Sequence, residues 1–200
     1  RISLDKLIEL HIHQVTPKFI SDLKELGYRN LRLNRLVEMR IHRATPEYIS
    51  ELQQHGYSDI DPSKLVEMRI HGVDPDYVEE LARLGYRDIN PSKLVEMKIH
   101  GVSTYYIEDM QELGFKNLRP SKLVEMSIHD VEVGYVKDLI KLGLDDLTPS
   151  DLVSMSIHNV SIGFIEDLIE RGYDDLSADE LVELKIHGLD RKRSRRESSY

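Results

Sequence analysis

The chain repeats itself every 29 residues. Prolines recur at this spacing, and one histidine per repeat follows the same period from end to end. The histidines of this column are His13, His42, His71, His100, His129, His158 and His187. Self-similarity at a fixed period is typical of repeat architectures, in which each unit buries its apolar face against its neighbours. The repeats begin at residues 4, 33, 62, 91, 120, 149 and 178, and the last is a half-repeat.

The repeat 62–90 predicts two short helices. Asp61 is a good N-cap, and Pro62 suits the first helical turn, where its missing N–H costs nothing. The apolar stripe at helical spacing consists of Leu65, Val66, Met68 and Ile70, with Val73 placed to fold back on the helix. The glycines that predict left-handed helix ends in this repeat and the next are Gly72, Gly85, Gly101 and Gly114.

Helices of about ten residues are not stable alone in water, so their apolar faces must be covered by neighbouring repeats. The sequence therefore predicts an all-α protein: an α-solenoid of six two-helix repeats and a terminal half-repeat, spanning residues 4–189. Residues 190–200 form a basic tail for which we expect disorder. The corner residues Gln14 and Arg43 replace glycine and predict a looser turn in the first two repeats.

The charge balance is acidic, with 36 Asp and Glu against 27 Lys and Arg and a net charge of −9. The tail opposes this balance, and its candidate phosphate or anionic-lipid contacts are Arg191, Lys192, Arg193, Arg195 and Arg196. An acidic body repels a nucleic-acid backbone over its general surface. The absence of cysteine excludes disulfides and thiolate metal sites. The absence of any run of 18 apolar residues predicts no membrane span.

The segment LGYRDINPSKLVEMKIHGV, residues 84–102, resembles a repeat of bacterial sensor proteins. In those proteins, similar units follow a transmembrane metallopeptidase domain of the β-lactam-sensor type. The resemblance extends over all the repeats and implies a non-catalytic sensing or regulatory appendage. The HExxH motif of the peptidase is absent from this chain, so the resemblance carries over no catalytic residues.

The histidine column allows two interpretations. Glu67 lies four residues before His71, most repeats have the same pair, and residues at this spacing share a helix face. Stacked pairs suggest a metal or catalytic column. However, zinc needs three or four ligands at about 2.0–2.3 Å, whereas packed helices lie about 8–10 Å apart. We therefore expect histidines that end helices, lie buried between repeats and bind backbone, and we predict no metal, cofactor or catalytic residue.

Each helical hairpin also resembles a helix-hairpin-helix DNA module, whose second helix binds phosphate at its N-terminus. In this chain Asp74 replaces the second glycine of that module, and Asp76, Glu79 and Glu80 crowd the same helix start. These acidic residues disfavour nucleic-acid binding by the repeats.

Positions that vary between repeats predict solvent-facing surface. One such row is basic early and neutral later: Arg40, Arg69, Lys98, Ser127, Ser156 and Lys185. A second row turns apolar at Ile140 and Ile169, and these isoleucines either form an exposed pair or bury against each other or the half-repeat. The exposed pair, rimmed by Lys137, Lys141, Glu166 and Glu170, is a candidate partner patch.

These observations favour a non-catalytic module that offers an extended surface to a protein or peptide. One alternative is a regulatory appendage of a membrane metallopeptidase. The other is phosphate-backbone binding by the hairpins or the tail.

Overall fold

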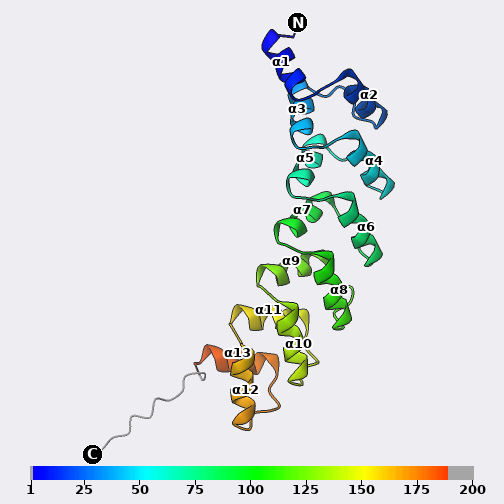
Figure 1. Cartoon of the computed structure of the whole chain (residues 1–200). Coiled ribbons are helices and arrows are strands. Elements are labelled where there is room, and N and C mark those ends of the chain that lie inside the picture. Colours follow the sequence, from blue (N-terminus) through cyan, green and yellow to red (C-terminus); the bar gives the residue numbers. More distant parts are fainter. Residues whose placement is uncertain (1, 189–200) are drawn as a thin grey trace, which may run out of the picture. The chain divides into compact units, whose positions relative to one another are not determined.

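The computed structural model describes residues 2–188, which form thirteen short α-helices and no strand (Figure 1). The helices are α1 (Leu4–Ile12), α2 (Pro17–Glu25), α3 (Leu33–Ile41), α4 (Pro46–Gln54), α5 (Pro62–Ile70), α6 (Pro75–Arg83), α7 (Pro91–Ile99), α8 (Thr104–Glu112), α9 (Pro120–Ile128), α10 (Val133–Lys141), α11 (Pro149–Ile157), α12 (Ile162–Glu170) and α13 (Ala178–Ile186). The odd-numbered helices begin at the residues where the sequence repeats begin. The basic tail, with Arg191, Lys192, Arg193, Arg195 and Arg196, lies outside the described residues.

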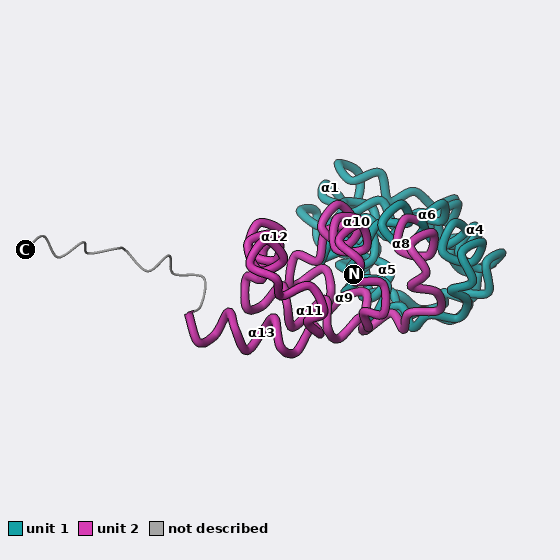
Figure 2. The backbone as a smooth tube through the Cα atoms, turned by 90° about the horizontal axis from the view of Figure 1, so that it is seen from below, with its two compact units in different colours: residues 1–108 teal, residues 109–200 magenta. Residues whose placement is uncertain are grey.

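The chain divides into two compact units, residues 1–108 and 109–200 (Figure 2). In the first unit, α1, α3, α5 and α7 pack in succession, and α2, α4 and α6 form a parallel series. In the second unit, α9, α11 and α13 pack in succession, and α10 packs on α12. Odd helices therefore contact odd helices and even helices contact even ones, which confirms the predicted α-solenoid arrangement of two-helix repeats.

The turns between the two helices of each repeat follow the predicted glycine stop. In the repeat of α5, the Val73 N–H donates to the Met68 carbonyl at 2.8 Å, and the Gly72 N–H donates to the Arg69 carbonyl at 3.3 Å. These two bonds form a Schellman motif, which requires a left-handed residue, and Gly72 has φ +70°. Gln14 (φ +55°) and Arg43 (φ +58°) adopt the same conformation. The looser turn expected at these two residues is therefore not formed.

The left-handed backbone at Arg43 (φ +58°) is strained. A residue with a Cβ atom in this conformation lowers the free energy of unfolding by about 1 kcal/mol relative to glycine. We expect Arg43→Gly to raise the free energy of unfolding by about 1 kcal/mol and Gly72→Arg to lower it by a similar amount. Urea unfolding followed by far-UV ellipticity measures both. Changes of the same sign in the two variants would contradict this account of the turn.

Aromatic side chains on the even helices join each repeat to the next. The Tyr48 hydroxyl donates to the Val73 carbonyl at 2.8 Å, and the Tyr77 hydroxyl donates to the Val102 carbonyl at 2.8 Å. In the second unit the Tyr135 hydroxyl donates to the Val160 carbonyl at 2.6 Å. Each bond satisfies a carbonyl in the turn of the following repeat, and a buried bond of this kind contributes about 1 kcal/mol.

The basic side chains of the row that was predicted to face solvent lie over aromatic rings of the even helices instead. Its cations lie 4.5–4.9 Å from the ring centres of the preceding repeat, in the pairs Arg40 over Phe19, Arg69 over Tyr48, Lys98 over Tyr77 and Lys185 over Phe164. Where the row is neutral, the Ser156 hydroxyl donates to the His129 carbonyl at 2.6 Å. The row is half-buried and belongs to the inter-repeat interface, so its assignment as free partner surface was wrong.

Candidate binding surface

The isoleucine before each histidine of the column is the most exposed apolar feature that recurs in every repeat. Its exposed fraction lies between 48% and 65% in all seven copies: Ile12, Ile41, Ile70, Ile99, Ile128, Ile157 and Ile186. The prediction that Ile70 belongs to the buried stripe was therefore wrong. Ile70 follows the fully buried Leu65 by five residues, a rotation that leaves it about 140° from the centre of the buried face.

Identity between repeats is unusual at this surface. The isoleucine and the histidine after it are the same in all seven repeats. Another exposed position, the second residue of each even-numbered helix, differs between most repeats: Lys18, Glu47, Asp76, Tyr105, Gly134 and Gly163. The leucine shared by all repeats, such as Leu65, is explained by burial, and the shared glycine, such as Gly85, by its φ of +94°. Packing and backbone geometry do not explain the isoleucine and histidine in this way.

We call these residues the two ridges. The N-terminal ridge consists of Ile12, Ile41, Ile70 and Ile99, each with the histidine that follows it. The C-terminal ridge consists of Ile128, Ile157 and Ile186, each with its following histidine. Each ridge lies within one compact unit and runs across consecutively packed odd helices.

The histidines end the helices as predicted but are not buried. Each is the C-cap residue, and its backbone N–H donates to the carbonyl four residues before, as His71 does to Glu67 at 3.1 Å. His13, His42 and His129 are half-buried, and the other four are exposed. The predicted burial between repeats was wrong: His71 follows the half-exposed Glu67 by four residues and so shares its helix face, away from the buried Leu65 and Val66.

The histidines do not converge on one another to form a metal site. Within residues 2–188, no group of three or more histidine, aspartate or glutamate side chains is placed to hold a metal ion. What each repeat offers at its ridge is an exposed apolar side chain, an imidazole and, in most repeats, a carboxylate. This set suits noncovalent contact with another chain, through burial of the isoleucine and hydrogen bonds to the polar groups.

Ion pairs run beside the ridges at residues three apart. They join Arg35 with Glu38, Lys64 with Glu67, Lys93 with Glu96 and Lys122 with Glu125. In α11 and α13 the basic residue is replaced by Asp151 and Glu180, whose carboxylates accept from the backbone N–H groups of Thr148 and Ser177. The bond from Ser177 lowers the pKa of Glu180, so this carboxylate is charged at neutral pH.

The predicted partner patch is not an exposed apolar pair. Ile140 and Ile169 are half-buried. Ile169 lines a cavity of about 70 Å³ together with Ile165 and with Leu181 of the terminal half-repeat. This matches the alternative in which the isoleucines bury. The four charged residues Lys137, Lys141, Glu166 and Glu170 are exposed, and Lys137 pairs with Asp109 at 3.8 Å.

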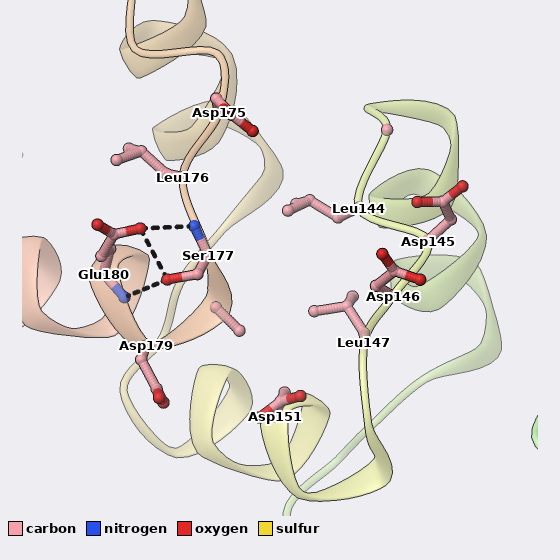
Figure 3. Close-up of a pocket in the computed structure, with 12 residues that line it drawn as sticks. Leu144, Asp145, Asp146, Leu147, Asp151, Asp175, Leu176, Ser177, Asp179 and Glu180 are labelled. Carbon is pink, nitrogen blue, oxygen red and sulfur yellow. Dashed lines mark hydrogen bonds between the residues drawn. The ribbon is translucent and has the colours of Figure 1, made fainter.

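A groove of about 400 Å³ lies between two linkers of the second unit. In Figure 3, Leu144 and Leu147 point across it toward the segment of Ser177. The acidic residues that line the groove are Asp145, Asp146, Asp151, Asp175, Asp179 and Glu180. Asp146 and Asp175 occupy the same repeat position as Asp59 and Asp88, but only the latter two take left-handed φ angles. The groove therefore arises where the linker geometry changes.

Comparison with family models, curated proteins and solved structures gave no match. The resemblance to repeats of bacterial sensor metallopeptidases therefore stays a prediction. Among the described helices, none alone has the length and hydropathy of a membrane span. Only α11 and α12 taken together reach that length and hydropathy, with a 93° bend between them.

Proposed function

We propose that the chain is a non-catalytic repeat module that binds a protein or peptide along its ridges. The observation that carries this proposal is the isoleucine–histidine pair, which is exposed or half-exposed in every repeat and identical in all seven. The repeats differ in sequence at other exposed positions, such as the second residue of each even helix, but not at this pair. A surface kept in this way is expected where each repeat makes the same contact with a partner.

Burial of the ridge isoleucines would contribute part of the binding free energy of a complex. Full burial of an isoleucine contributes about 1.5–3 kcal/mol, so covering a half-exposed one contributes about 1 kcal/mol. Four such contacts along the N-terminal ridge, with hydrogen bonds to the polar groups, offset part of the entropic cost of association. The net charge of −9 opposes nucleic acid as the partner.

A peptide-display selection tests the proposal. A random library displayed on phage is selected on the immobilised full chain alone. The enriched peptides are then tested on a ridge variant, in which Ile41, Ile70, Ile99, Ile128 and Ile157 are changed to serine. We expect enriched peptides whose binding falls at least tenfold on the ridge variant. The matched control changes Tyr105 and Tyr173, which are 74% and 57% exposed and lie off the ridges, and it should bind normally.

Far-UV ellipticity of both variants must match that of the unaltered chain, so that loss of binding reflects the surface. Equal binding of the selected peptides to the ridge variant and the unaltered chain would refute the proposal. So would a selection that enriches nothing.

A further inference from the structure

The two ridges differ in charge. On α3, α5 and α7 the one acidic residue of each helix is paired with a basic one: Glu38 with Arg35, Glu67 with Lys64 and Glu96 with Lys93. Among the helices of the C-terminal ridge, only α9 has such a pair, Lys122 with Glu125. Helix α11 has Asp151 and no basic residue, and α13 has Asp179, Glu180 and Glu183.

The second unit as a whole is also acidic. Residues 109–188 contain 17 Asp and Glu against 7 Lys and Arg, whereas residues 2–108 contain 17 against 14. The only cation on α13, Lys185, lies over the Phe164 ring. A partner of the C-terminal ridge is therefore favoured if it is positively charged, because complementary potentials speed encounter and exclude wrong partners.

The spacing of the isoleucines favours an extended partner. Helices α9, α11 and α13 pack in succession, and packed helices lie about 8–10 Å apart. A chain in polyproline II conformation advances about 3.1 Å per residue with three residues per turn, so every third side chain returns to the same side after about 9 Å. One apolar residue in three would then meet one isoleucine per repeat.

The polar groups beside each isoleucine suit the same kind of partner. The backbone N–H and C=O groups of an extended peptide need partners when water is displaced. Glu125 and Glu183 lie three residues before Ile128 and Ile186, on the same helix face, and each of these isoleucines is followed by a histidine. A helical peptide satisfies its own backbone and would leave these groups unused.

Deepening the proposed function, on which this step rests, we propose that the C-terminal ridge binds a basic peptide in the extended polyproline II conformation, with an apolar residue at every third position. Ile128, Ile157 and Ile186 receive the apolar side chains, one per repeat. The carboxylates of α11 and α13 face the basic residues between them.

Synthetic peptides test this directly against the full chain. The probe is four copies of Leu-Lys-Arg with a fluorescent label, and its affinity is measured by anisotropy. We expect the triple variant I128S/I157S/I186S to bind it roughly a hundredfold more weakly. The matched control variant Y105S/Y173S, at exposed residues off the ridges, should change the affinity less than about threefold. Raising the salt from 0.05 to 0.5 M should weaken binding roughly tenfold.

Three control peptides separate the elements of the proposal. Four copies of Leu-Glu-Glu should not bind, and a peptide of the probe's composition with its leucines contiguous should bind at least tenfold more weakly. A helix-forming peptide with leucine at every seventh position has a similar leucine spacing, and tighter binding of this peptide would overturn the extended mode.

The acidic groove near Ser177 is the competing site for a basic probe. If Asp145→Asn with Asp146→Asn weakens the probe more than the ridge triple variant does, the peptide is held by the groove and the inference is wrong. Failure of the probe alone, while display-selected peptides still require the ridge, would overturn this inference and leave the proposed function standing. Failure of both would overturn both.

Discussion

Replacing Leu94 with alanine is expected to lower the free energy of unfolding by about 3 kcal/mol, within the range for a fully buried leucine. Leu94 is 0% exposed in α7, and α7 packs on α5 in the next repeat back. Because each repeat is stabilised by its neighbours, the cavity weakens an interface as well as one helix. Urea unfolding followed by far-UV ellipticity measures the loss.

The matched control is Ile99→Ala in the same helix. Ile99 is 54% exposed, so its truncation removes less buried surface, and we expect a loss below about 1 kcal/mol. A loss at Ile99 as large as that at Leu94 would show that the isoleucine is a packing residue. That outcome would remove the argument that its recurrence reflects partner binding.

The chain is expected to unfold cooperatively in alkali as its inter-repeat tyrosines ionise. Burial raises the pKa of Tyr28, Tyr106 and Tyr135 to about 12 and that of Tyr48 and Tyr77 well above the usual range. An unfolded tyrosine ionises near pH 10. Between about pH 10 and 12 the folded state therefore binds more protons than the unfolded state. The contribution of these tyrosines to the free energy of unfolding is full below pH 10 and falls as the pH rises.

Tyrosinate absorbance at 295 nm and far-UV ellipticity test this together. We expect the tyrosinate signal of the buried residues to appear in the same pH interval as the loss of helix, between about pH 10 and 12. Tyr135→Phe should move this midpoint upward, because it removes one hydroxyl whose ionisation disfavours the folded state. A phenylalanine fits this position, since Phe19 and Phe164 occupy it in other repeats. Full ionisation of the tyrosines near pH 10 with the helices intact would show that these hydroxyls are not held in the interface.

Local signals along the chain predicted much of the fold. The proline that starts α5, the capping residue Asp74 and the left-handed Gly72 act within a few residues of themselves, and the period repeats these signals along the chain. The left-handed turns at Gln14 and Arg43 were not anticipated. The Schellman hydrogen bonds formed by the neighbouring residues hold these side chains in a conformation that they do not prefer.

The candidate site was much less predictable. Sequence reasoning singled out the histidine and placed the neighbouring Ile70 in the core, because an isoleucine at helical spacing is usually buried. Its invariance across the repeats was visible in the sequence, but invariance alone does not separate a core residue from a surface one. For the basic row the error was the reverse, because residues that vary between repeats were predicted to face solvent. Arg69 and Lys98 instead lie over the buried rings of Tyr48 and Tyr77.

The sequence by itself determined the period, the positions where odd-numbered helices begin and the left-handed turns at Gly72 and Gly101, since these depend on short-range capping and backbone sterics. Only the tertiary structure decided which sector of each nine-residue helix faces its neighbours. That choice depends on how odd helices pack on odd helices, and the packing buries Leu65 and Val66 while leaving Ile70 at the edge, exposed beside His71.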